Sequence, residues 1–121
     1  MIVARLNMPV NDNKGVELNS IHARLKMELV TEFLGCTITK GQGVWANDGV
    51  IYDEPVLIYE VAFFNQKIMH KYMLDKFIEI AHKYGAEASQ LAVYYTIDGK
   101  AFVDDVKPPF AVQSRPSPAK P

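Results

Sequence analysis

The chain has 121 residues, 49% of them hydrophobic and 22% charged, which is an ordinary composition for one globular domain with its own core. Thirteen Lys and Arg residues against fourteen Asp and Glu leave a formal net charge of -1, which argues against general nucleic-acid binding because that needs an excess of positive charge. Cys36 is the single cysteine, and no apolar run approaches the roughly 18 residues of a membrane span, so we expect a cytoplasmic protein with no membrane partner.

The first part of the chain predicts a strand followed by a helix. Apolar residues alternate with other residues from Ile2 to Met8, as in a strand with one buried face. After a polar loop, a helix is expected to begin near Asn19 or Ser20, which are both good N-caps, and to stop at Gly35. Its apolar stripe comprises Ile21, Leu25, Leu29 and Phe33, widened by Val30 and Leu34.

The middle of the chain predicts a hairpin that contains glycines. Residues 36–40 are rich in Thr and Ile and predict a strand that continues through Gly41-Gln42-Gly43, where the glycines predict a bulge or a close approach. Asn47-Asp48-Gly49 predicts the turn of the hairpin. Pro55 then predicts a kink or a sheet edge before a long strand over residues 56–64.

The last part of the chain predicts a second helix and a terminal hairpin. Asn65 can cap the helix and Gly85 is expected to end it, with an apolar stripe of Met69, Met73, Phe77, Ile80 and Tyr84. Alternation over residues 91–95 and the Asp98-Gly99 turn predict two strands. Residues 107–121 are rich in proline and are expected to form an irregular tail.

This order of elements predicts an α+β fold, the ferredoxin-like βαββαβ antiparallel sheet with two helices on one face and an extra C-terminal strand. Residues 1–106 would form this single domain, and residues 107–121 the tail. The other sheet face would stay open. The large rings are too many for the helix side alone, so we expect some of them on the open face, where they favour self-association or a ligand: Trp45, Tyr52, Tyr59, Tyr94 and Tyr95.

Two polar features mark candidate sites. The Lys40-Gly41-Gln42-Gly43 segment could present backbone amides and a lysine to an anion, although a structural bulge is favoured over a phosphate contact. Glu60 is an acidic residue in mid-strand, and we favour a solvated carboxylate or a pair with Arg5 over a ligand contact. The three histidines, His22, His70 and His82, are expected at the surface, and their spacing predicts no metal site.

The segment from Gly35 to Tyr95 resembles small ferredoxin-like phage proteins, including the phage S-adenosylmethionine lyases. The resemblance lies in the glycine after the first helix, the aromatic Trp45, the acidic pair Asp53-Glu54 before a strand, and the aliphatic strand at 91–94. It implies a ligand held between the subunits of a trimer. It further implies that Glu54 or Glu60 faces a sulfonium and that Trp45 or Tyr52 stacks on adenine.

The favoured hypothesis is a homo-oligomeric binding protein that encloses a nucleotide-like small molecule, as in phage proteins that sequester a nucleotide immune signal. It needs no catalytic residue, metal or cofactor. The candidate ligand-binding residues are Arg5, Asn7, Lys40, Gln42, Trp45, Tyr52, Glu54, Glu60 and Tyr94. The alternatives are an S-adenosylmethionine lyase and a protein-interaction inhibitor that acts through its open sheet face or its proline-rich tail.

Overall fold

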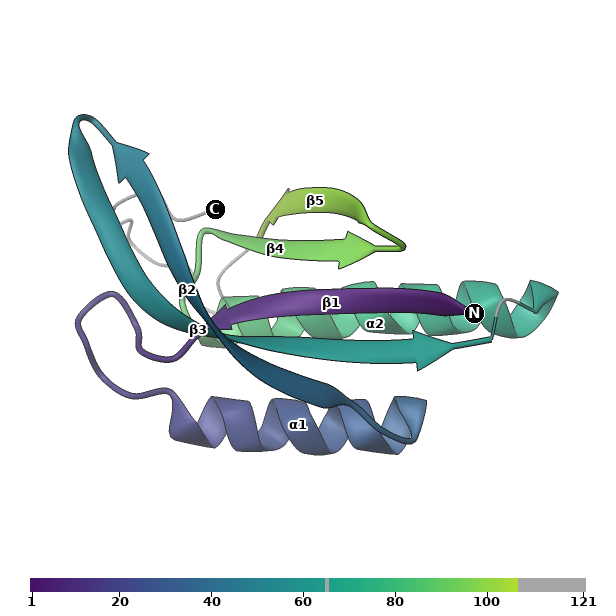
Figure 1. Ribbon diagram of the computed structural model, residues 1–121. Coiled ribbons are helices and arrows are strands. Elements are labelled where there is room, and N and C mark those ends of the chain that lie inside the picture. The colour runs from purple at the N-terminus through teal and green to yellow at the C-terminus, as the bar shows by residue number, and fades with distance from the viewer. Residues whose placement is uncertain (65, 107–121) are drawn as a thin grey trace.

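The computed structural model describes residues 1–64 and 66–106, apart from the side chains of Asn47, Lys67 and Ile68. Two helices lie on one face of a single five-stranded sheet (Figure 1). The elements are β1 (Ile2–Pro9), α1 (Asn19–Phe33), β2 (Thr37–Asn47), β3 (Val50–Phe63), α2 (Lys67–Glu87), β4 (Ala92–Ile97) and β5 (Lys100–Asp105). Neither of these helices combines the length and the apolar character needed to cross a bilayer.

The sheet has the strand order β2-β3-β1-β4-β5, and every neighbouring pair is antiparallel. The first four strands in this order form the ferredoxin-like core, and β5 adds an edge beyond β4. The predicted fold class is therefore confirmed, including the extra C-terminal strand. Strand β1 lies at the centre, paired with β3 from Ile2 to Pro9 and with β4 from Ala4 to Asn7.

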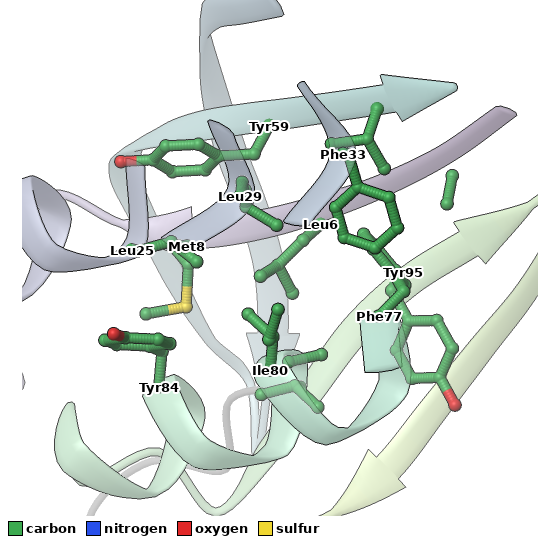
Figure 2. Close-up of a cluster of buried hydrophobic side chains, with 14 of the residues drawn as sticks. Leu6, Met8, Leu25, Leu29, Phe33, Tyr59, Phe77, Ile80, Tyr84 and Tyr95 are labelled. Carbon is green, nitrogen blue, oxygen red and sulfur yellow. The ribbon is translucent and has the colours of Figure 1, made fainter. Parts of the chain in front are cut away.

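The core lies between the helices and the inner face of the sheet (Figure 2). Alternate residues of β1 are buried there, as the period of two predicts: Ile2, Ala4, Leu6 and Met8. Tyr59 and Tyr95 belong to this core and are almost completely buried. Trp45, Tyr52 and Tyr94 project from the opposite face, as strand alternation requires, so the predicted division of the aromatic residues between the two faces is confirmed.

The ends of α1 differ from the sequence prediction. The residue that caps its first turn is Leu18, and no side chain bonds the free amides there, so neither Asn19 nor Ser20 is the N-cap. At the other end Leu34, not Gly35, adopts the left-handed conformation, with φ of 68°. Leu34 is 90% exposed and Val30 is also exposed, so these two residues do not widen the buried stripe.

Gly85 does not end α2, which continues to Glu87. A methyl group at Gly85 would lie 2.1 Å from Cγ1 of Val93, so this glycine allows the helix to approach β4 closely. Met69 is exposed and is not part of the buried stripe. The predicted cap Asn65 and the predicted proline-rich tail, residues 107–121, lie outside the described residues.

Strands β2 and β3 extend beyond the rest of the sheet as a two-stranded arm, residues 42–55 (Figure 1). Their register is unbroken, so the predicted bulge at the glycines is wrong, whereas the alternative of a close approach is right. A methyl group at Gly41 would lie 3.1 Å from the side chain of Ile58 and 3.2 Å from that of Val56.

Pro55 lies inside β3, at the base of the arm, and does not interrupt the strand. Its carbonyl accepts a hydrogen bond from the amide of Val10 at 3.1 Å. The nitrogen and the carbonyl of one residue in a strand point to the same side, so the missing N–H of Pro55 faces away from β2. The β2–β3 ladder loses no hydrogen bond there, which explains how the strand continues through a proline.

Candidate functional site

The arm and the adjacent ends of β1 and β4 form a cleft of about 240 Å³ on the sheet face opposite α1 and α2, which we call the open face. In Figure 1 the arm leaves the sheet at the end of β1 and rises beside the beginning of β4. The described residues that line the cleft are Asn7, Met8, Pro9, Gly43, Val44, Trp45, Glu54, Val56, Gln90, Ala92, Val93 and Tyr94. The cleft therefore collects residues from four strands and from the segment before β4.

Two aromatic residues, Trp45 and Tyr94, line the cleft. Trp45 and Tyr52 are cross-strand partners in the arm, and their rings stack with centroids 5.5 Å apart and planes inclined by 20°. Tyr94 projects from β4 beside Asn7 of β1, its partner in the register. Stacked rings of this kind present a flat, polarisable surface suited to a planar base.

The polar groups of the cleft are few. Glu54 lies on β3 opposite Gly43, and Asn7 and Gln90 contribute side-chain amides. Gln90 is 4% exposed, and its side-chain amide donates to the carbonyl of Ala88 at 3.2 Å. The sequence analysis did not predict Gln90, although a glutamine directly before an aliphatic strand could have indicated a polar residue at the beginning of that strand.

Four of the nine predicted binding residues line this cleft: Asn7, Trp45, Glu54 and Tyr94. Tyr52 joins them through its stacking contact with Trp45. The small lining residue Gly43 was not among the predicted residues. Gly43 lies on the same face of the arm as Trp45, the face toward the cleft, because the two residues are separated by two positions in β2.

Arg5 and Glu60 lie on the same open face, outside the cleft. The guanidinium Nε donates to Oε1 of Glu60 at 2.7 Å, so the predicted pairing of these residues across the sheet is confirmed. Both side chains remain partly exposed, at 48% for Arg5 and 37% for Glu60.

Lys40 and Gln42 project from the other side of β2, because they alternate with the residues that face the cleft. Gln42 donates a hydrogen bond to Asp53 at 2.7 Å. Gly41 and Gly43 lie in a regular ladder and neither has a positive φ, so the backbone here does not form the alternating conformation of an anion-binding nest. The structure thus separates these two predicted residues from the cleft.

His22 is buried, contrary to the expectation that all three histidines lie at the surface. Its Nε2 lies 2.7 Å from the carbonyl oxygen of Pro9 and its Nδ1 lies 2.5 Å from the hydroxyl of Tyr59. Burial raises the pKa of Tyr59 to about 12, so the hydroxyl keeps its proton at neutral pH. His22 thereby links the core to Pro9, which lines the cleft.

The chemistry of the remaining titratable groups is modest. Among the described residues, no three His, Cys, Asp or Glu side chains gather in a way that could hold a metal ion. Burial raises the pKa of the Cys36 thiol, which keeps the sulfur in its less nucleophilic protonated form.

No protein-family model matches the chain, and no curated protein sequence matches it. Solved structures that share its fold include two of phage SAM lyases. A phage SAM lyase in complex with S-methyl-5'-thioadenosine matches with a TM-score of 0.63 and 11% identity, over 87% of this chain and 89% of that one. A phage SAM lyase in the apo state matches with a TM-score of 0.62 and 14% identity, over 88% of this chain and 86% of that one. The resemblance to phage S-adenosylmethionine lyases is therefore confirmed at the level of fold.

Proposed function

We propose that the cleft binds a small nucleoside-like ligand, and that adenosine thioethers and sulfoniums such as S-methyl-5'-thioadenosine and S-adenosylmethionine are the first class to test. The observation that carries this proposal is a cleft lined by Tyr94 and by Trp45, whose ring is stacked on that of Tyr52. Stacking of a base on an aromatic ring contributes roughly 1–3 kcal/mol. A phage lyase of the same fold has been solved with S-methyl-5'-thioadenosine bound, which supports the choice of ligand class.

The charge of the cleft favours a neutral or cationic ligand. Of the described lining residues, Glu54 is the one with a charged side chain. A carboxylate and aromatic faces both attract a sulfonium, whereas a phosphate close to Glu54 would be repelled. We therefore place nucleosides ahead of the phosphate-bearing immune signals that the sequence alone suggested.

The size of the cleft favours completion by a second copy of the chain. Its volume of about 240 Å³ falls slightly below the roughly 300–1,000 Å³ of typical ligand sites. Because the cleft opens on the sheet face opposite α1 and α2, which neither of these helices covers, a neighbouring subunit could close it. The proposal accordingly includes a homo-oligomer. The shared fold suggests that this oligomer acts inside a phage-infected bacterium.

A fluorescence titration tests the binding proposal directly, because the chain contains one tryptophan and Trp45 lines the cleft. We expect S-methyl-5'-thioadenosine and S-adenosylmethionine to change the emission, and a cyclic dinucleotide or a cyclic ADP-ribose isomer to have little effect. Calorimetry should show that Tyr94→Ala weakens binding by roughly tenfold or more. Tyr72→Ala is the matched control, since Tyr72 is an exposed tyrosine on α2 away from the cleft. Emission unchanged by every nucleoside would contradict the proposal.

The second candidate function is an S-adenosylmethionine lyase, favoured by the shared fold. In this reaction the ligand's own carboxylate attacks its γ-carbon and the bond from that carbon to sulfur breaks. The electron pair of the broken bond stays on sulfur, giving neutral methylthioadenosine and homoserine lactone. The reaction needs no protein nucleophile, and opposite charges on the substrate disappear in the transition state, so a partly dehydrated site would accelerate it.

Product analysis tests this second candidate. The lyase should release methylthioadenosine and homoserine lactone, whereas a binding protein returns intact S-adenosylmethionine after long incubation. Should products form, Glu54→Gln is expected to raise KM more than it lowers kcat, because a carboxylate beside the sulfonium stabilises the charged ground state most.

The third alternative, a protein-interaction inhibitor, stays a prediction. Residues 107–121, on which part of it depends, lie outside the described residues. Capture experiments with the full chain and with a version shortened to residue 106 test it, since loss of a partner on shortening is expected only for this alternative.

A further inference from the structure

Arg5 and Glu60 occupy the row of residues next to the cleft on the open face. Arg5 is paired with Glu60 of β3 on one side and with Thr96 of β4 on the other. Asn7, which lines the cleft, follows Arg5 by two positions on the same face of β1. Two residues of a strand span about 7 Å, so a ligand held in the cleft needs only a short extension to reach this row.

The two charged groups are close together and open to further contacts. The bond from Nε to Oε1, at 2.7 Å, uses one of the five N–H donors of the guanidinium and one of the two carboxylate oxygens. The side chains are 48% and 37% exposed. An ion pair this exposed contributes only about 0–1 kcal/mol to stability, so a ligand can displace or share it at little cost.

The charges match one chemical group in particular. The α-amino acid unit of S-adenosylmethionine carries a carboxylate and an ammonium on the same carbon, so it presents both signs within a few ångströms. We infer that Arg5 and Glu60 form a subsite for the zwitterionic α-amino acid end of the ligand, with the carboxylate at Arg5 and the ammonium at Glu60. This inference rests on the proposed function, because the aromatic cleft holds the nucleoside end.

The subsite has a consequence for the choice between binding and cleavage. A carboxylate that is hydrogen-bonded to a guanidinium is a weaker nucleophile than a free one. With its carboxylate held at Arg5, the ligand is less able to close the lactone. The subsite therefore favours retention of intact S-adenosylmethionine.

The test compares two neutral thioethers that differ in this end group. S-adenosylhomocysteine carries the α-amino acid and S-methyl-5'-thioadenosine does not. Calorimetry should show that S-adenosylhomocysteine binds at least about tenfold more tightly, and that Arg5→Gln or Glu60→Gln removes this advantage while binding of S-methyl-5'-thioadenosine stays within about twofold. Lys71→Gln is the matched control, because it breaks another exposed ion pair, with Asp75 on α2. Equal affinities of the unmodified protein for the two thioethers would overturn the subsite. So would an equal loss of affinity for both thioethers in Arg5→Gln.

A second measurement makes the subsite testable without any nucleoside. In a heteronuclear NMR titration of the full chain, L-methionine should shift the amide signals of Arg5, Glu60 and Thr96. N-acetyl-L-methionine, which lacks the ammonium, should not. Shifts with methionine but no binding of any nucleoside would support the subsite and overturn the proposed function. Binding of S-methyl-5'-thioadenosine without any shift from methionine would support the proposed function and overturn the subsite.

Discussion

His22 connects the core of the protein to the cleft through its two ring nitrogens. The carbonyl oxygen of Pro9 can only accept, so the nearby Nε2 must carry a hydrogen. In the neutral ring Nδ1 is then the acceptor, and Tyr59 donates its hydroxyl hydrogen to it. The ring is nearly parallel to that of Tyr59, at 16°, so packing and hydrogen bonding hold the same orientation.

Removing the hydroxyl of Tyr59 should therefore destabilise the fold. In Tyr59→Phe the buried Nδ1 of His22 loses its donor, and a buried acceptor without a partner costs about 1–3 kcal/mol. Urea unfolding should show this loss in the free energy of unfolding. Tyr52→Phe, on the arm, keeps its ring and serves as the control, with an expected change within about 0.5 kcal/mol. Equal stabilities of the two variants would contradict this account of His22.

At the level of single elements, the contact between α2 and β4 depends on the missing side chain of Gly85. Gly85→Ala would bring a methyl group to 2.1 Å from Cγ1 of Val93, which forces the helix or the strand to move. Overpacking of this kind costs roughly 1–3 kcal/mol. Thermal or urea unfolding should show the loss, and Val93→Ala in the same chain should recover part of it by making room.

Gly35→Ala provides the matched control for that experiment. Gly35 lies after α1 and has no positive φ, and apart from Gly35 itself and its two chain neighbours no described residue has an atom within 4 Å of the position of an added methyl group. We expect a neutral or slightly stabilising effect there, because alanine restricts the unfolded chain. If both glycine variants were equally stable, close packing at Gly85 would not be the reason for the glycine.

Strand β5 pairs with β4 along its whole length, and Asp104 adds side-chain hydrogen bonds to β4 and to α2. Its carboxylate accepts hydrogen bonds from the hydroxyl of Tyr95 on β4 and from Nε2 of His82 on α2, the latter at 2.9 Å. These bonds, first that from Tyr95 and then that from His82, lower the pKa of Asp104 below its usual value. Burial and the same carboxylate raise the pKa of Tyr95.

The stabilisation that Asp104 provides should depend on pH. Because its pKa is lower in the folded state, the stabilisation is fully present above the unfolded value of about 3.9 and is lost as the pH falls through the folded value. Asp104→Asn should therefore cost about 1–2 kcal/mol at pH 7 and progressively less below about pH 4. Urea unfolding of both proteins at several pH values measures the difference, and Asp105→Asn on the outer side of β5 is the control. A difference that did not shrink in acid would contradict the role of the charge.

The sequence predicted the elements well because strand alternation and helical stripes are local patterns. The details that it missed depend on contacts between distant residues. Gly85 resembles a helix stop until Val93 is placed beside it. His22 could have been found, since His22, Leu25, Leu29 and Phe33 follow helical spacing and are the buried residues of α1.

The candidate site was predictable in part for the same reason. Alternation places Tyr94 and Tyr95 on opposite faces of β4, so one ring had to face away from the core. Register and alternation also separate Trp45 from Gln42 in the arm. The cleft itself was not predictable, because it arises from the departure of the arm from the sheet near Pro55 and from its approach to β4.

On the scale of the whole molecule, the arm is the part of the fold that we expect to contact a second copy of the chain. A two-stranded ribbon alone is marginally stable in water, and this one exposes three aliphatic side chains, Val44, Val50 and Ile51. Burial of such residues by a second copy would stabilise the arm. We therefore expect the protein to be a homo-oligomer whose contacts include the arm.

Light scattering after size exclusion should give a mass that is a multiple of the chain's own, and Ile51→Asp should reduce it to that of one chain. The reason is that a carboxylate at Ile51, now 65% exposed, would be buried without a partner in the assembly. Leu34→Asp is the matched control, because Leu34 is even more exposed but lies at the end of α1 farthest from the arm (Figure 1). If the second copy completes the cleft, Ile51→Asp should also weaken nucleoside binding, whereas Leu34→Asp should not. An unmodified protein that runs as a single chain and still binds the nucleoside would show that one copy is enough.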